Sequence, residues 1–184
     1  LNEALLIACC AVDAADKALL PATFHALERD LNATPSQLGL LSLCQSIAYS
    51  LALPVWGAAT AAFKTRDLLV AGCWIWGSST ALLATTTSYH MHCLLRLLNG
   101  AGLCGVMPIA QALLCDLVPE DQRGAAFGRL QASTALAGML ASWLAVSRQA
   151  VDVDLLGITT LKGWQWVYLQ VSATSLLLGL LVRQ

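Results

Sequence analysis

Four charged residues lie inside stretches that are otherwise long and apolar: Asp13, Asp16, Lys17 and Arg96. Asp13 and Lys17 have i, i+4 spacing with the acid first, the favourable order for an ion pair on a helix. Such a pair leaves Asp16 as an unbalanced carboxylate, and a carboxylate partly shielded from water can take up and release protons. The spacing predicts proton or ion coupling at Asp16. The alternative is that the three charges only neutralise one another in a hydrated vestibule.

Arg96 needs an anionic partner, because a guanidinium is not deprotonated in proteins. The candidates are Asp16, Asp13 and an anionic solute. Two placements stay open: the side chain faces a cavity, or it extends to the outer headgroups. Residues that let helices approach closely or unwind follow it in the sequence, as in helices that line transporter sites: Asn99, Gly100, Gly102, Gly105 and Pro108.

Uncharged polar side chains extend this set of candidates. The predicted coupling and solute-binding residues are Asp13, Asp16, Lys17, Arg96, Asn99, Gln45 and Tyr49. These residues belong to the first, second and fourth apolar stretches, and Gln131 adds a polar group to the fifth. The third and sixth stretches carry no ionisable residue, so we expect them to face lipid around a cavity lined by the other four. The alternative role for any single Ser, Thr or Gln is a hydrogen bond between helices.

The elements that must position these residues are membrane helices. Of the 184 residues, 58% are hydrophobic and 11% are charged, against roughly 25% charged in a soluble domain. A helix of about 20 residues crosses the hydrocarbon core, and the apolar stretches are Ala- and Leu-rich without strand-like alternation. The sequence predicts an all-α membrane protein with spans at about 5–27, 38–63, 68–87, 92–116, 125–147 and 165–182.

Several function classes are disfavoured. A net charge of -1 offers no basic surface for nucleic acid. The seven cysteines form no metal-ligand spacing, so no metal or other cofactor is expected. Motifs of intramembrane enzymes are missing, so an enzyme is not expected. A chain that begins at Leu1 and stops just after an apolar stretch suggests a fragment of a longer protein.

Lysine and arginine in the connecting loops predict the orientation, since their excess is normally cytoplasmic. One side holds Lys64, Arg66, Arg123, Arg129 and Arg183, and the other holds Arg29, Arg148 and Lys162. This bias places both termini in the cytoplasm. It does not separate the plasma membrane from an endolysosomal membrane.

Four segments resemble motifs of the major facilitator superfamily. The segment from Asp116 to Gly128 is similar to the loop after the family's fourth helix, and Arg96 to Gly102 to its RxxxGxG motif. Gly163-Trp-Gln-Trp166 resembles the entry to the sixth helix, and Gly57 to Leu69 the loop pattern GxLADRxGRRxxL. The segments Asp16 to Pro21 and Gly39-Leu-Leu look like the corresponding segments of spinster-like transporters of sphingolipids and lysolipids.

The resemblance implies the N-terminal six-helix half of an alternating-access carrier, built from 3+3 inverted repeats. The expected partners are an organic solute, for which a lipid-like or anionic molecule is one candidate, and a C-terminal six-helix half or a second copy. Carried over to this chain, Asp16 and Lys17 are the first-helix coupling pair, Arg96 is the fourth-helix arginine, and Arg66, Asp116 and Arg123 form the inner gate.

The chain departs from the family patterns at charged positions. Ala61 and Ala62 replace the Asp and Arg of the loop motif, Lys64 replaces its second Gly, and Leu103 stands where spinster-like fourth helices carry an acid. These losses favour an alternative function, a non-transporting or degenerate half that acts as an assembly partner.

Overall fold

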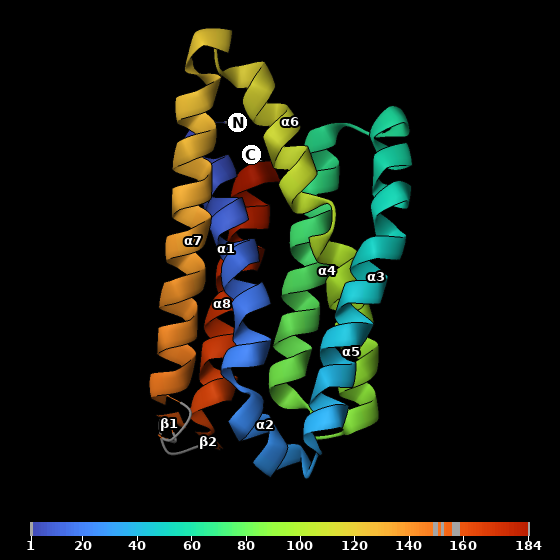
Figure 1. Ribbon diagram of the computed structural model, residues 1–184, viewed down its shortest axis with the longest axis vertical. Coiled ribbons are helices and arrows are strands. Elements are labelled where there is room, and N and C mark those ends of the chain that lie inside the picture. The colour runs from blue at the N-terminus through green and yellow to red at the C-terminus, as the bar shows by residue number, and fades with distance from the viewer. Residues whose placement is uncertain (1, 149–150, 152, 156–158, 184) are drawn as a thin grey trace.

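The computed structural model describes residues 2–148, 151, 153–155 and 159–183. Its helices are α1 (Glu3–Ala22), α2 (Phe24–Leu31), α3 (Pro35–Ala62), α4 (Thr65–Thr85), α5 (Tyr89–Leu103), α6 (Val106–Leu117), α7 (Arg123–Arg148) and α8 (Gly163–Arg183). A short 3₁₀ turn, Glu120–Gln122, precedes α7. The long helices run side by side as a bundle, with both chain ends at the end where α6 meets α7 (Figure 1).

Five segments in the described part of the chain are long and apolar enough to cross a membrane: Pro35–Ala62, Thr65–Thr85, Tyr89–Leu117, Glu120–Arg148 and Gly163–Arg183. They correspond to the second to sixth predicted spans. Helix α1 has 20 residues but carries Asp13, Asp16 and Lys17 in its C-terminal half. It nevertheless packs against α6, α7 and α8. The all-α membrane fold predicted from the sequence is therefore confirmed.

Two predicted spans are each divided into two helices. The first span ends at Ala22, where Pro21 disrupts the last turn, and the Thr23 hydroxyl donates 2.8 Å to the Leu19 carbonyl before α2 begins. The fourth span breaks between α5 and α6, where Trp56 packs against Gly105 and its Nε1 donates 2.8 Å to the Ala101 carbonyl. A Cβ at Gly105 would lie 2.6 Å from the Trp56 ring, so the break needs glycine.

The helix pairs have an internal symmetry. The most extensive contacts join α1 to α7, α3 to the α5 segment, and α4 to α8. Numbered as spans, these pairs are first with fifth, second with fourth, and third with sixth. Exchanging the first three spans for the last three maps the set of pairs onto itself. This is the arrangement expected for 3+3 inverted repeats.

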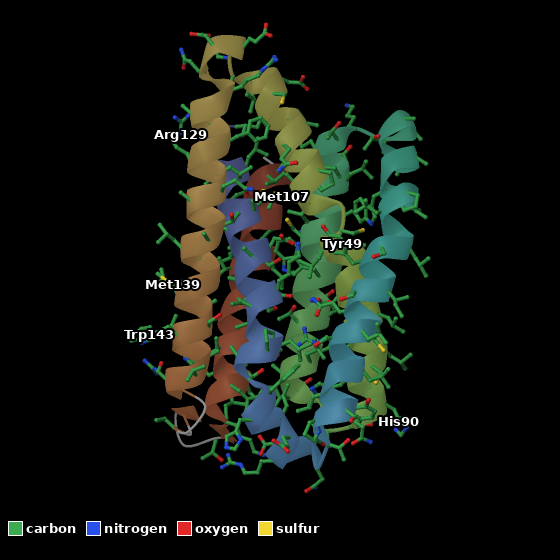
Figure 2. The ribbon with its side chains drawn as sticks, viewed as in Figure 1. Tyr49, His90, Met107, Arg129, Met139 and Trp143 are labelled. Carbon is green, nitrogen blue, oxygen red and sulfur yellow. The ribbon has the colours of Figure 1, made fainter. Side chains whose placement is uncertain are left out.

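The helices of the bundle differ in how much of their surface is buried. Helices α3 and α7 bury few of their residues, and Met139 and Trp143 project from the outer side of α7 (Figure 2). Helices α4 and α8 bury many, including Trp76 and Tyr168. Helices α4 and α8 pack one face on each other and on α5 or α1 and also expose large apolar side chains, so the expectation that the third and sixth spans face lipid stays a prediction. The long exposed apolar faces belong to α3 and α7.

The connector between α7 and α8 contains a small antiparallel hairpin, β1 (Val153–Leu155) and β2 (Thr159–Leu161), with Asp154 opposite Thr160. The sequence predicted no strand, and the hairpin is confined to this loop. It lies with α2 at the end of the bundle opposite the termini (Figure 1).

Candidate functional site

Asp16 is the centre of a buried polar network contributed by four helices. The residue is 1% exposed. Thr80 of α4 donates 2.6 Å to its Oδ1, and Asn99 of α5 donates 3.1 Å to its Oδ2. Asn99 also donates 3.0 Å to the Thr80 hydroxyl and accepts 2.8 Å from Gln45 of α3. Both carboxylate oxygens are therefore hydrogen-bonded to neutral groups rather than to a cation.

The ion pair expected from the i, i+4 spacing is present one turn away. Lys17 Nζ lies 2.8 Å from Asp13 Oδ2 and 4.8 Å from the centroid of the Tyr49 ring. The Asp13 side chain is 1% exposed and the Lys17 side chain 36% exposed. Asp13 Oδ1 has no hydrogen-bond partner in the described residues. The Lys17 ammonium group thus lies at the surface of the bundle, whereas its partner Asp13 is buried.

A cavity of about 440 Å³ opens beside Lys17, between α1 and α3. Tyr49 lies on the side of α3 that faces the other helices (Figure 2). The cavity lining combines one ammonium group, hydroxyls, an amide and apolar atoms: Lys17, Leu20, Pro21, Ser42, Gln45, Ser46, Tyr49 and Ser50. Ser46 and Ser50 donate to backbone carbonyls of their own helix, so their oxygens remain free to accept from a solute. This lining suits an amphipathic molecule with a polar or anionic group.

Arg96 is buried against α8 rather than placed in either of the two predicted positions. The residue is 1% exposed, so it does not extend to the headgroups, and it does not line the cavity beside Lys17. Its Nη2 donates 2.7 Å to the Tyr168 hydroxyl, and its guanidinium lies 5.5 Å from the centroid of that ring. Among the described residues no carboxylate lies within 4.0 Å of it, and its Nε has no partner.

Tyr168 joins Arg96 to the break between α1 and α2. Its hydroxyl lies 3.1 Å from the Thr23 hydroxyl, which itself donates to the Leu19 carbonyl. Its ring packs edge-on against Trp164, with ring centroids 5.5 Å apart. Since the Thr23 hydroxyl donates to the Leu19 carbonyl, one chain of hydrogen bonds runs from Arg96 through the Tyr168 and Thr23 hydroxyls to that carbonyl.

Thr80 and Tyr168 were missed by the sequence reasoning. Thr80 lies in the third span and Tyr168 in the sixth. These spans were set aside because they hold no acidic or basic residue within their apolar stretches. A neutral hydroxyl in an apolar span costs little and gives no charge signal. The signal that could have found them is that a buried carboxylate and a buried guanidinium need hydrogen-bond partners.

The three residues predicted as an inner gate do not contact one another in this conformation. Arg66 Nε donates 2.5 Å to the Val182 carbonyl of α8, and Arg123 Nη2 donates 3.1 Å to the Cys115 carbonyl. Asp116 has no ion pair with either arginine in the described part of the chain. In this conformation Arg66 and Arg123 instead cap two separate helix ends, and the inner gate stays a prediction. The physical reason is that free carbonyls at the end of a helix attract cations.

A second ionic cluster closes the opposite end of the bundle. Asp30 of α2 lies 2.7 Å from Lys162 Nζ and accepts 2.7 Å from Trp164 Nε1 of α8. Burial disfavours the charged form of Asp30, but the hydrogen bonds from Lys162 and Trp164 outweigh it and hold the pKa of this carboxyl below its ordinary value of 3.8. These contacts fasten α2 to the start of α8.

The comparisons with known proteins assign the family. The model of the Major Facilitator Superfamily matches residues 5–183. The chain therefore belongs to the Major Facilitator Superfamily. A protein of Acinetobacter baumannii described as a quinolone resistance transporter is 33% identical over 116 residues, which are 63% of this chain and 25% of that protein.

Solved structures share the fold. A bacterial homologue of the human lysosomal transporter Spinster, in an inward-facing and occupied conformation, superposes with a TM-score of 0.86 at 17% identity, over 98% of this chain and 43% of that one. A D-xylose–proton symporter gives a TM-score of 0.82 at 16% identity, over 99% and 47%. At such identities the likeness establishes the fold alone. The chain spans less than half the length of each of these relatives.

Proposed function

We propose that this chain forms one half of an alternating-access secondary transporter for an organic solute, coupled to protons at Asp16. The observation that carries the proposal is the environment of Asp16. It is a buried carboxylate with hydrogen bonds from Thr80 and Asn99 and, within the described residues, no cation within 4.0 Å. Neutral partners can rotate their hydroxyl or amide groups to serve either protonation state.

The solute site of this half is the cavity beside Lys17. The Lys17 ammonium contacts Asp13 and the Tyr49 ring, so an anionic group on the solute would compete with Asp13 for it. Leu20 and Pro21 supply an apolar wall. An aromatic carboxylate or an anionic lipid-like solute matches this lining, and the relative described as a quinolone resistance transporter makes a quinolone a reasonable first probe. The first-helix segment, Asp16 to Pro21, supports a place among spinster-like carriers.

The orientation proposed is with both termini in the cytoplasm. Lys64, Arg66, Arg123 and Arg129 lie near the helix ends at which the two termini also lie (Figure 1). Positive charge is normally retained on that side. In the other conformation of the carrier, Arg66, Asp116 and Arg123 act at this end as the inner gate.

The test is proton-driven uptake by the full-length protein in proteoliposomes. Asp16→Asn keeps the size and shape of the side chain but cannot titrate, so we expect uptake driven by a pH gradient to be lost while solute exchange without a gradient continues. Asp121→Asn, in an exposed loop, is the matched control. Unchanged pH-driven uptake by Asp16→Asn would remove Asp16 from the coupling.

A second candidate function is a non-transporting half that assembles with a partner. Leu103 favours it, because this side chain is fully buried in the apolar core at the position where spinster-like helices carry an acid. Ala61 and Ala62 likewise remove charges from the loop. If the full-length protein exchanges no probe solute, and Asp16→Asn leaves its assembly unchanged, this second function is the better one.

A further inference from the structure

An open groove lies at the junction of α4 and α8, at the end of the bundle that holds both termini. Its volume is about 290 Å³, and it is lined by Asp67, Val70, Ala71, Trp74 and Arg183. The cavity beside Lys17 lies between α1 and α3, so the two share no residue. The groove therefore lies outside the proposed solute site.

The groove is held in shape by two contacts. Arg66 donates 2.5 Å to the Val182 carbonyl, so Asp67 and Arg183, which follow these two residues, lie at the same helix junction. Trp74 packs closely against α8 at Gly179, where a Cβ would lie 2.5 Å from the indole ring. The glycine thus makes room for the indole beside the groove.

The charges of the groove are opposite and unpaired. Asp67 and Arg183 are both exposed, and no ion pair joins them to each other or to another group in the described residues. Trp74 is 43% exposed, and its indole N–H has no hydrogen-bond acceptor among the described residues. Tryptophan in membrane proteins is enriched at the level of the headgroups.

We propose that this groove binds a zwitterionic phospholipid whose headgroup carries a primary ammonium, such as phosphatidylethanolamine. The phosphate takes the Arg183 guanidinium, which matches it in a bidentate geometry. The ammonium donates to the Asp67 carboxylate, and an acyl chain lies along Val70 and Trp74. A headgroup with no ammonium N–H cannot make the second contact, and an anionic headgroup would meet Asp67 unfavourably.

The test measures retained lipid on the full-length protein by native mass spectrometry after titration with phosphatidylethanolamine, phosphatidylcholine or phosphatidylglycerol. We expect phosphatidylethanolamine to be retained best. Asp67→Asn should lower its retention by about threefold to fivefold, toward that of phosphatidylcholine, since an exposed ion pair contributes up to ~1 kcal/mol. Arg183→Gln should weaken both zwitterionic lipids.

Two controls separate lipid binding from the effect of charges on their own helix ends. Asp121→Asn removes an exposed acid near the same end of the bundle and should leave all three lipids unchanged. Gly179→Leu displaces the indole without altering either charge and should also lower retention. The proposal is overturned if Asp67→Asn binds phosphatidylethanolamine as the unmodified protein does, or if phosphatidylglycerol is retained best.

Discussion

The Arg96 guanidinium and the Tyr168 hydroxyl are 2.7 Å apart in a part of the bundle that water does not reach. A buried charge that loses a partner is costly, and this contact is the hydrogen bond that the described residues provide for Arg96. The same hydroxyl contacts Thr23 at the end of α1. Tyr168 therefore links the charge of the fourth span to the break in the first.

Removing this hydroxyl should destabilise the protein. Tyr168→Phe keeps the ring and its packing on Trp164, so the loss is confined to the hydrogen bonds. We expect the free energy of unfolding to fall by about 1.5–3 kcal/mol, the scale of a hydrogen bond to a charged group. Denaturant unfolding of the full-length protein in detergent measures it.

Tyr89→Phe is the matched control for this variant. The Tyr89 hydroxyl donates 3.0 Å to the Gln37 carbonyl at an exposed position, so its loss should change stability by less than ~0.5 kcal/mol. Equal effects of the two variants would mean that the Arg96 contact contributes nothing beyond an ordinary hydroxyl.

Thr80 should control the coupling proposed at Asp16. Thr80→Val keeps the shape of the side chain but removes the 2.6 Å hydrogen bond to the carboxylate. A hydrogen bond to a charged group contributes roughly 1.5–3 kcal/mol. We therefore expect pH-driven uptake to fall by about tenfold or more, while solute exchange without a gradient changes little.

The comparison variant is Thr85→Val on the same helix. The Thr85 hydroxyl donates 3.0 Å to the Leu82 carbonyl of its own helix and faces outward. Uptake should match that of the unmodified protein. If Thr80→Val and Thr85→Val behave alike, the Thr80 contact has no part in coupling.

Some of this arrangement follows from the sequence and some does not. The long apolar stretches define the helices because a helix satisfies its backbone polar groups without water. The spacing of Asp13 and Lys17 predicts their ion pair because neighbours four residues apart share a helix face. The contact from Tyr168 to Arg96 spans 72 residues, and no local pattern encodes it. The same applies to the inner gate residues, whose contacts depend on which helix ends meet.

Acid should loosen the end of the bundle that Asp30 fastens. The pKa of this carboxyl is lowered, so its contacts with Lys162 and Trp164 add stability above its ordinary value of 3.8, and this stability is lost as the pH falls through the lowered pKa. In Asp30→Asn the unfolding temperature should depend less on pH below 3.8 than in the unmodified protein. Thermal unfolding over a series of acid buffers measures this slope.

The control is Glu28→Gln on the same short helix. Glu28 is exposed and has no ion pair in the described residues. Its acid slope should equal that of the unmodified protein. An Asp30→Asn slope that also equals it would show that the acid sensitivity arises elsewhere in the chain.

Close helix contact in the fourth span depends on its glycines. A Cβ at Gly100 would overlap the Gln45 carbonyl oxygen of α3, and one at Gly102 would lie 2.8 Å from the Trp76 nitrogen of α4. Backbone cannot rotate away as a flexible side chain can, so α5 would have to move. We expect Gly100→Ala and Gly102→Ala to lower the free energy of unfolding by about 1–3 kcal/mol each.

Gly128 on α7 has no atom within 4 Å of a Cβ position. Gly128→Ala should leave stability unchanged or raise it by up to ~1 kcal/mol, since alanine restricts the unfolded chain and favours a helix.

Because Gln45 also donates to Asn99, Gly100→Ala should in addition reduce pH-driven uptake. Gly102→Ala, which displaces α5 from α4 instead, tests whether any movement of this helix has that effect. If all three variants unfold at the same denaturant concentration, the close approach of these helices does not stabilise the bundle.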